Sequence, residues 1–337
     1  MATHLLVSNP TAQSGKNKER IKVAEGLFRA RGIEVDLLPT LPGGKTILAV
    51  AGVLDAGHHR VVIAMGGDGT FREVAAGLCE SRRRDEVAMG MLPTGTANDQ
   101  GKSFGLEATA EAMDRNVEVI ALGHETRLDG GILELGERSG GFSRRDRFFD
   151  SAGFGLSARV LAQRNRDRDF VETLGPVKEL YRDHVVYAGA FFKTFLESYI
   201  ENDKFSLHAE LDGVPMRLEG LSDLIVKATR IYAGSWVFDP TSHHDDGAFE
   251  LVPFRGKRDW TSKAIVDLDG NPINEALLNE FGIEHSHPIR ASRMDLSFEV
   301  PEGGVPIFAQ IDGEEWPFEP HVRITVEKQA LRLIVPG

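Results

Sequence analysis

A glycine-rich turn that contains one carboxylate is the sequence feature with the clearest chemical meaning. Residues 60–65 have the pattern of a buried strand, Gly66-Gly67-Asp68-Gly69-Thr70 follow directly, and residues 71–80 have the apolar spacing of a helix. Three glycines in four positions leave backbone N–H groups open and permit positive φ. The helix directs the positive end of its dipole at the same place, so the turn is predicted to bind phosphate.

Asp68 is the charged residue of this turn and allows more than one interpretation. A carboxylate there would repel a phosphate unless a cation lies between them or unless the carboxylate accepts a proton. Both cases indicate Mg-nucleotide chemistry. The plain alternative is a strand-to-helix turn in which Asp68 is the N-cap of the helix, and the turn alone does not decide between them.

Two further motifs place carboxylates at predicted turns. Asp312 and Glu314 flank Gly313 after an apolar strand, which suits either a general base held by its neighbour or an ordinary β-turn. The run His243-His244-Asp245-Asp246-Gly247 suits either a hard cation such as Mg²⁺ or a hairpin, because Asp-Gly is a common hairpin signal. Each motif on its own leaves both possibilities open.

The elements that must position these residues follow two different patterns along the chain. Up to about residue 125, strand patterns at 4–7, 33–38, 60–65 and 87–92 alternate with helix patterns at 18–31, 46–56, 71–80 and 106–116. Strands joined by crossover helices form a parallel sheet, and ligands bind beyond the carboxyl ends of such strands. We therefore expect the loops at 8–16, 38–40, 66–70 and 92–99 to converge on one edge of one sheet.

From about residue 205 onward, short strands with turn signals predict a mostly antiparallel β domain, interrupted by helical sequence near 259–281. Aromatic residues at helical spacing between positions 187 and 199 suit core packing, and the same face could hold an apolar ligand. The predicted fold is therefore α/β followed by all-β.

Composition and charge exclude several classes of protein. The 337 residues contain 39 Lys and Arg against 51 Asp and Glu, and a net charge of −12 disfavours a general nucleic-acid binder. The single Cys79 excludes an intramolecular disulfide and any multi-cysteine metal site. No stretch approaches the roughly eighteen consecutive apolar residues of a membrane span, and the N-terminus lacks a signal-peptide pattern. We expect a cytoplasmic protein without a transmembrane segment.

Four motifs, taken in order, resemble the diacylglycerol kinase catalytic-domain family, which includes bacterial lipid kinases and sphingosine and ceramide kinases. They are Gly66-Gly67-Asp68-Gly69-Thr70, Gly95-Thr96-Ala97-Asn98-Asp99, Asp246-Gly247 and Asp312-Gly313-Glu314. The resemblance covers nearly the whole chain, and the more distant NAD kinases share the first turn. It implies a parallel-sheet α/β ATP-binding domain at 1–125, an antiparallel β-sandwich lipid or acceptor domain at 126–337, and an active site in the cleft between them.

The resemblance also implies roles for individual residues. Glu314 and Asp312 would be the catalytic pair that deprotonates the acceptor hydroxyl, and Asp68 competes with them for that role or binds the Mg-nucleotide. Asp246 would hold a structural Mg²⁺ with the carbonyls of His243 and Ala248. ATP would be held by Asn9, Thr40, Gly66, Gly67, Asp68, Gly69, Thr70 and Thr96.

Four positions depart from the family pattern. Arg72 and Asp150 stand where family members usually have Asn, Gln100 replaces an aromatic residue, and His243 contributes no carboxylate. The first departure affects contacts at the nucleotide, and the last weakens the metal site. These departures keep open a non-catalytic nucleotide- or lipid-binding regulator, although the retained Asp312 and Glu314 argue against it.

The resemblance implies an ATP- and Mg²⁺-dependent lipid kinase that transfers the γ-phosphoryl group to a diacylglycerol-like or sphingoid-like hydroxyl. Such an enzyme of lipid metabolism and phospholipid biosynthesis would meet its substrate at a membrane surface, as a peripheral protein. An NAD-kinase-like activity on a soluble hydroxyl acceptor is the alternative enzyme. A homodimer is a further expectation that the sequence leaves open.

Overall fold

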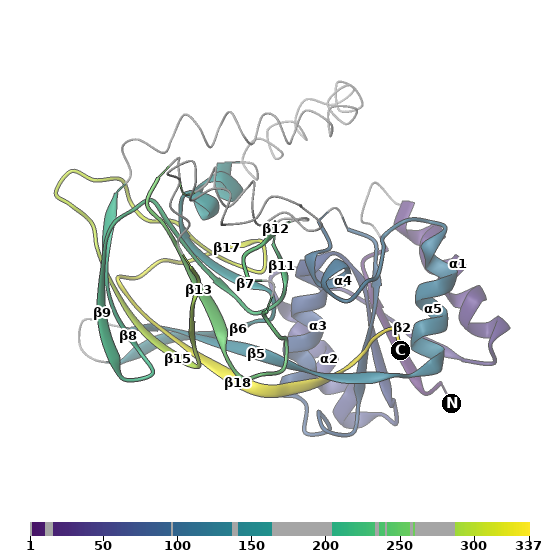
Figure 1. The fold of residues 1–337 in the computed structure, drawn as a ribbon. Coiled ribbons are helices and arrows are strands. Elements are labelled where there is room, and N and C mark those ends of the chain that lie inside the picture. Colours follow the sequence, from purple (N-terminus) through teal and green to yellow (C-terminus); the bar gives the residue numbers. More distant parts are fainter. Residues whose placement is uncertain are drawn as a thin grey trace.

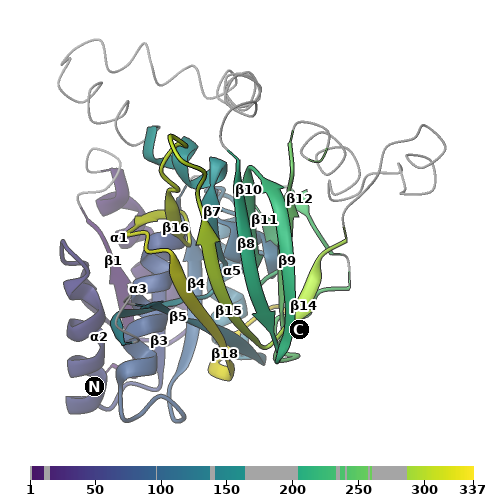
Figure 2. The same cartoon turned by 90° about the vertical axis from the view of Figure 1, so that its left-hand side faces the viewer.

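The computed structural model describes residues 2–10, 16–95, 97–136, 141–163, 204–232, 236–239, 241–256, 259 and 287–337. The aromatic positions between 187 and 199, and residues 260–281 of the predicted helical segment, lie outside this set. Figure 1 and Figure 2 show the described elements in two views at right angles.

Four parallel strands form one end of a ten-stranded sheet, in the order β2-β1-β3-β4. They are β1 (His4–Ser8), β2 (Val35–Pro39), β3 (Val61–Gly66) and β4 (Ala88–Pro93). Strands β1, β3 and β4 are buried almost throughout, as the near-continuous apolar runs of a parallel sheet require, whereas β2 is the half-exposed edge.

Helices cover both faces of these parallel strands (Figure 1). Helices α1 (Lys16–Ala30) and α5 (Ala112–Leu122) contact each other on one side, and α2 (Lys45–Ala56) and α3 (Asp68–Glu80) contact each other on the other. Gly77 of α3 permits the close packing, because a Cβ there would lie 2.7 Å from the Ile47 carbonyl oxygen of α2. This arrangement confirms the predicted α/β half.

The predicted helix at 106–116 is wrong in its position. A short helix α4 (Asp99–Ser103) comes first, and α5 starts only at Ala112. The apolar positions that face the sheet are Met113, Val117 and Ile120, which continue beyond the predicted end, and Gly123 with φ 67° closes the helix. The prediction counted Leu106 as the first apolar residue of the helix, whereas this buried residue lies in the connection before α5.

The remaining strands form an antiparallel β half, as predicted. Six of them extend the first sheet: β5 (Glu125–Gly136), β6 (Phe142–Phe148), β8 (Phe205–Leu211), β9 (Val214–Leu221), β15 (Arg293–Glu299) and β18 (His321–Ile334). A second sheet contains β14 (Ile289–Ala291), β13 (Phe249–Phe254), β10 (Asp223–Lys227), β7 (Ser151–Gly155), β16 (Ala309–Ile311) and β17 (Glu314–Trp316). Strands β11 (Ile231–Tyr232) and β12 (Trp236–Val237) make a separate pair. The larger apolar cluster of the β half contains side chains from both large sheets.

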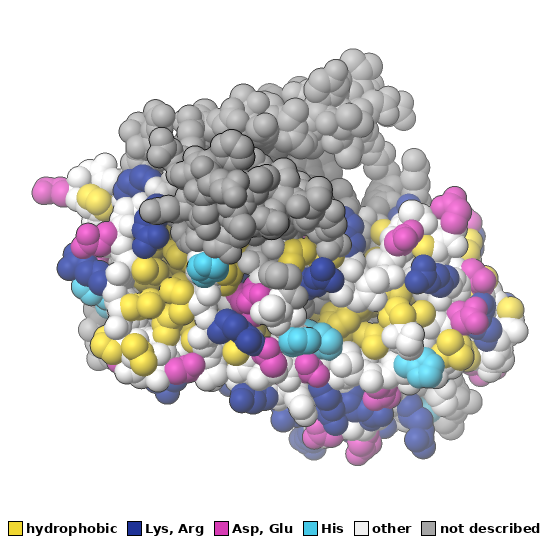
Figure 3. All heavy atoms as spheres, viewed as in Figure 1, with side chains coloured by type: hydrophobic (Ala, Val, Ile, Leu, Met, Phe, Trp, Pro, Cys, Tyr) yellow, Lys and Arg dark blue, Asp and Glu magenta, His cyan; other side chains and the backbone are white. Residues whose placement is uncertain are grey.

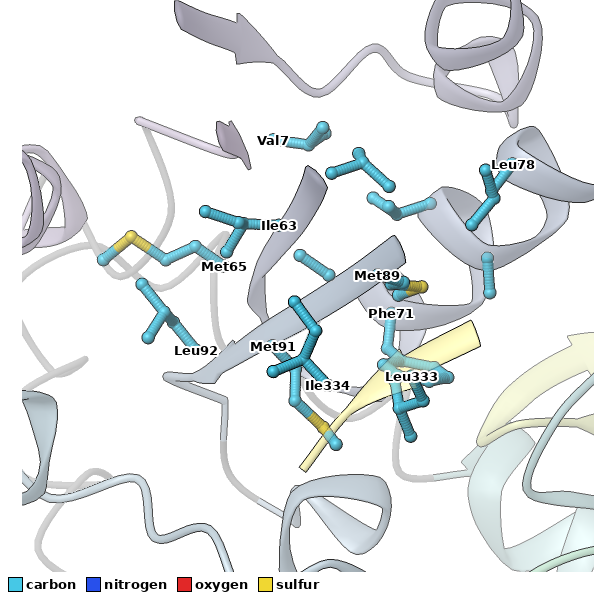
Figure 4. Packing of buried hydrophobic residues seen from close by; sticks show 14 of the residues in the cluster. Val7, Ile63, Met65, Phe71, Leu78, Met89, Met91, Leu92, Leu333 and Ile334 are labelled. Atoms are coloured by element: carbon cyan, nitrogen blue, oxygen red, sulfur yellow. The ribbon is translucent and has the colours of Figure 1, made fainter. Parts of the chain in front are cut away.

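Strand β18 joins the two halves of the molecule (Figure 1). Its first part pairs antiparallel with β15, and its last part pairs parallel with β4 through Arg332 and Leu333. Strand β5 pairs along nearly all of it, with an irregularity between Glu327 and Leu331. Leu333 and Ile334 therefore pack in the core of the α/β half, beside the residues of β3 and β4 (Figure 4).

A buried carboxylate stabilises the irregular stretch of β18. Asp129 of β5 is fully buried and accepts hydrogen bonds from the backbone N–H groups of Gln329 and Gly247, each at 2.6 Å. Gln329 has φ 50°, a conformation that few residues adopt without such support. Through these two hydrogen bonds, the carboxylate links the 243–247 turn to β18. Burial raises the pKa of Asp129, because removal from water disfavours the charged carboxylate.

We expect Leu333→Ala to lower the free energy of unfolding by about 2–5 kcal/mol, because it removes a fully buried side chain from the α/β core. Chemical denaturation measures the loss, and amide exchange in β3 and β4 should speed up with it. Val214→Ala, at a side chain 64% exposed in β9, is the control and should cost no more than about 0.5 kcal/mol. Equal losses in the two variants would contradict the role assigned to β18.

Candidate active site

The loops after the four parallel strands meet at one sheet edge, as the sequence predicts. Thr40 donates its N–H to the Ser8 carbonyl at 3.0 Å, and the Ser8 hydroxyl donates to the Met65 carbonyl at 2.8 Å. Thr94 donates its N–H to the Gly66 carbonyl at 2.8 Å. The predicted nucleotide residues Asn9, Thr40 and Gly66–Thr70 therefore lie along one edge, whereas Thr96 and residues 11–15 are outside the described set.

The glycines of the turn provide space for close approach. None of Gly66, Gly67 and Gly69 has positive φ, so the turn does not use the left-handed conformation that these glycines permit. A Cβ at Gly95 would lie 2.5 Å from the Gly67 Cα, so the two turns touch backbone to backbone. Helix α3 begins at Asp68 with Gly67 as its N-cap, and the first N–H groups of a helix have no partner within the helix. This supports an anion-binding site at the start of α3.

Asp68 is the first residue of α3, so the interpretation of this side chain as the N-cap is wrong. Its carboxylate accepts a hydrogen bond from the Gln100 N–H at 3.3 Å and lines a hollow with Gly67, Asn98 and Gln100. Burial, with a smaller contribution from Asp150, raises the pKa of Asp68. The carboxylate thus links the two loops that the resemblance assigns to the nucleotide.

Asp312 is held firmly by backbone groups. It lies with Gly313 in the two-residue turn between β16 and β17, and both have positive φ, 47° and 75°. Its carboxylate accepts N–H hydrogen bonds from Phe149 at 2.9 Å, Asp150 at 2.8 Å and Ser151 at 3.0 Å. Burial first, and then the negative charge of Asp150, raise the pKa of Asp312 to about 7.

Glu314 has a different environment from Asp312. Its side chain is 48% exposed and forms an ion pair with Arg72, whose side chain is only 11% exposed. A Cβ at Gly69 would lie 2.5 Å from Glu314 Oε1, so the carboxylate rests directly on the glycine turn. The structure therefore brings Glu314, from the antiparallel half, onto the turn that begins α3.

A second ion pair, which is buried, lies behind Asp312. Lys227 Nζ is 2.5 Å from Asp150 Oδ1, and Thr229 donates its hydroxyl to the same oxygen at 2.7 Å. Both charged side chains are almost completely buried. The positive charge of Lys227 compensates the negative charge of the Asp150 carboxylate.

Gln100 is also buried and donates its side-chain amide to the Phe149 carbonyl at 2.6 Å. It therefore contacts the same short segment that binds Asp312. Because Gln100 lies in the first turn of α4, this hydrogen bond connects the α/β half to residues 149–151.

Sequence reasoning missed the parts that Arg72, Lys227 and Arg20 play. Arg72 follows Gly69 by three residues and so lies one helical turn away on the same face, which is a signal that it faces the glycine turn. Lys227 directly follows the apolar run Leu224–Val226 of β10, and a lysine next to such a run is a signal for a buried partner. Arg20 reaches from α1 to the Thr94 carbonyl at 3.2 Å, a contact that no local pattern indicates.

In the 243–248 turn, the proposed metal ligand Asp246 already has partners for both carboxylate oxygens. Asp246 accepts the Ala248 N–H at 3.0 Å with one carboxylate oxygen and forms an ion pair with Arg290 through the other. Within the part of the chain that the structure describes, no group of three His, Cys, Asp or Glu side chains is placed to hold a metal. The structural Mg²⁺ with Asp246, His243 and Ala248 stays a prediction, and the ion would have to displace the Arg290 guanidinium.

Comparison with known proteins gives consistent results. A family model described as the diacylglycerol kinase catalytic domain matches residues 3–132. The chain is 32% identical over 138 residues to a protein of Citrobacter koseri named "Probable lipid kinase YegS-like", a match that spans 39% of this chain and 44% of the relative. A protein of the same name from Pseudomonas aeruginosa is 27% identical and is matched over 95% of this chain and 90% of its own length. The chain thus spans less than half of the first relative and most of the second.

Solved structures share the fold. A diacylglycerol kinase from Bacillus anthracis has a TM-score of 0.68 at 16% identity, with 99% of this chain and 97% of the other covered. A yeast NADH kinase in complex with NADH has a TM-score of 0.51 at 8% identity, with 100% and 84% covered. These likenesses confirm the predicted architecture of an α/β half and an antiparallel β half.

The raised pKa of Asp312 predicts how stability depends on pH. The folded protein keeps this proton up to about pH 7, whereas the unfolded chain loses it near pH 4. The resulting stability is full below pH 4 and is lost as the pH rises to 7, by at most about 1.4 kcal/mol per pH unit. We expect Asp312→Asn to make the free energy of unfolding fall less steeply between pH 5 and 7.

The control for this measurement is Asp212→Asn. Hydrogen bonds from Ser292 lower the pKa of Asp212, so its titration lies below the measured window. Burial also raises the pKa values of Asp223 and Glu250 to about 7. In both variants these two residues still make the free energy of unfolding fall as the pH rises. If the free energy of unfolding of Asp312→Asn depends on pH as in the wild type, then Asp312 is ionised over the whole range from pH 5 to 7.

The Asp246–Arg290 ion pair predicts a second result. If a divalent ion binds the turn, Arg290→Met should let millimolar Mg²⁺ raise the Tm more than in the wild type, because the competing cation is gone while the Asp246 and Glu250 carboxylates remain. Arg293→Met, which breaks the Arg293–Asp295 pair elsewhere, is the matched control. Equal Mg²⁺ effects in all three proteins would count against a metal at this turn.

Proposed function

The chain belongs to the diacylglycerol kinase catalytic-domain family, and from that premise we propose that it is an ATP-dependent lipid kinase that phosphorylates a lipid hydroxyl. The observation that supports this best is the contact of Glu314 with Gly69, which puts an accessible carboxylate over the turn suited to phosphate. A kinase needs a base next to its phosphate site. A protein that only binds nucleotide has no need of such a base.

The nucleotide site of the proposal is the edge formed by Asn9, Thr40 and Gly66–Thr70, together with Thr96. Phosphoryl transfer depends mainly on positioning and on neutralising charge, so the N–H groups at the start of α3 suit the β- and γ-phosphates. Mg²⁺ would arrive with ATP as part of the substrate and would supply positive charge to the phosphates. Asp68, at the first position of α3, is the carboxylate best placed to face that ion.

Glu314 is the proposed proton acceptor, with Asp312 as its positioning residue. Both Asp312 oxygens already accept backbone N–H groups, so this side chain fixes the 312–314 turn, whereas Glu314 is half exposed. As the acceptor oxygen bonds to the γ-phosphorus, the bond to the bridging oxygen breaks and its electron pair leaves on ADP. The hydroxyl proton passes to Glu314 in the same process.

The acceptor is proposed to be a diacylglycerol-like or sphingoid-like lipid, met at a membrane surface by a peripheral cytoplasmic protein of lipid metabolism. In the part of the chain that the structure describes, no helix combines the length and apolar character of a membrane span. On the face in Figure 3, Lys and Arg side chains of the described residues are interspersed with Asp and Glu, so that this part of the face does not present a single sign of charge to anionic lipid. Contact with the membrane would then depend on local apolar or basic groups, and a homodimer is compatible with this proposal.

The proposal is tested with γ-labelled ATP. The purified protein is incubated with mixed vesicles that contain diacylglycerol or a sphingoid base, and the labelled product is separated by chromatography. Transfer of label to a lipid supports the proposal. Transfer only to NAD or another soluble alcohol would support the soluble-acceptor alternative, and ATP binding without any transfer would support the regulator.

We expect Glu314→Gln to lower kcat by about a hundredfold or more while the protein still binds ATP, because it removes the proton acceptor and keeps the shape of the side chain. Glu315→Gln is the matched control, since the next residue of β17 makes the same chemical change on the opposite face of the strand. Steady-state kinetics of both variants measure the difference.

Asp68→Asn completes the series. If Asp68→Asn abolishes turnover but binds Mg-ATP normally, and Glu314→Gln is close to wild type, then the proton acceptor is Asp68. That result would overturn the assignment of Glu314.

A further inference from the structure

Arg72 is the cation of helix α3 that faces Glu314. Its side chain is only 11% exposed and pairs with the carboxylate of Glu314, a residue 242 positions later in the chain. Burial lowers the pKa of Arg72, but the charges of Glu314 and Asp312 raise it by more, so the guanidinium stays positive. A fixed positive charge therefore lies one helical turn from the phosphate-binding start of α3.

The ion pair leaves Arg72 incompletely satisfied. Among the described residues, its buried Nε has no hydrogen-bond partner, and a buried donor without a partner costs free energy. A guanidinium has five N–H donors in a planar fork that matches the oxygens of phosphate as well as those of carboxylate. Arg72 can therefore serve an anion with more acceptor oxygens than Glu314 provides.

Glu314 occupies the place where such an anion would bind. Its Oε1 would lie 2.5 Å from a Cβ at Gly69, so the carboxylate covers the first turn of α3. The open N–H groups and the helix dipole favour negative charge at this spot. The carboxylate of the protein itself and a phosphate of a nucleotide would compete for the same N–H groups and for the same arginine.

We propose, on the basis of the kinase function above, that Glu314 is an internal anion which the γ-phosphoryl group of ATP displaces. In the protein without nucleotide, Arg72 holds Glu314 over the turn. When ATP binds, Arg72 transfers to the γ-phosphoryl group, which has more negative charge and more acceptor oxygens. Glu314 is thereby released as a base only when the group to be transferred is present.

The two roles of Arg72 lead to different binding results. A γ-phosphate contact stabilises ATP but not ADP, whereas an arginine that only holds Glu314 affects both nucleotides equally. We expect Arg72→Asn to lower the ratio of ATP to ADP affinity by about tenfold or more, measured by calorimetry. Arg72→Lys should recover part of the ratio, because the charge remains and the fork is lost.

Glu314→Gln provides the complementary measurement. If the carboxylate competes with phosphate, its neutral isostere should bind ATP several-fold more tightly than the wild type while kcat falls. Arg84→Asn is the matched control, because it removes an arginine from an ion pair with Glu327, at 3.0 Å, outside the glycine turn. It should leave both nucleotide affinities unchanged.

An unchanged ATP-to-ADP ratio in Arg72→Asn, with no tighter ATP binding in Glu314→Gln, would overturn this inference even if the wild type phosphorylates a lipid. A wild type that binds neither nucleotide would instead overturn the proposed function itself. Thermal unfolding of each variant distinguishes loss of the fold from loss of the contact.

Discussion

The candidate site depends on how a buried carboxylate binds three consecutive backbone N–H groups. Asp312 accepts hydrogen bonds from residues 149–151, and this fixes the short turn between β16 and β17 against the start of β7. Glu314 is the next strand residue after that turn, so its position over Gly69 follows from the position of Asp312. A shift of this turn by one residue would put the neighbouring side chain on the wrong face of the strand.

Charge balance within the site follows from the same arrangement. Asp68, Asp150 and Asp312 are close enough that the charge of Asp150 raises the pKa values of the other two. Lys227 offsets Asp150, and Arg72 offsets Glu314 and Asp312. Arg72 and Asp150 thus each lie beside an opposite charge, and removing one member of either pair would leave the other charge without compensation.

Local patterns predicted the elements well and their long-range partners poorly. Strand and helix periodicity identified the parallel strands, and the direction of those strands required their loops to meet, as Thr40, Ser8 and Thr94 show. Nothing in the pattern of residues 321–335 indicates that Leu333 pairs with β4, because a strand does not specify its neighbour. The ion pairs of Arg72 and Lys227 were missed for the same reason, since each joins segments far apart in the chain.

The route of β18 has a consequence for folding during synthesis. The core of the α/β half contains Leu331, Leu333 and Ile334, and the ribosome adds them more than 200 residues after the end of α5. At usual elongation rates this corresponds to a delay on the order of 10 s or more. Until then, the edge of β4 lacks its partner and exposes apolar surface. The α/β half, although it is synthesised first, can therefore reach its final stability only after the antiparallel half has been made.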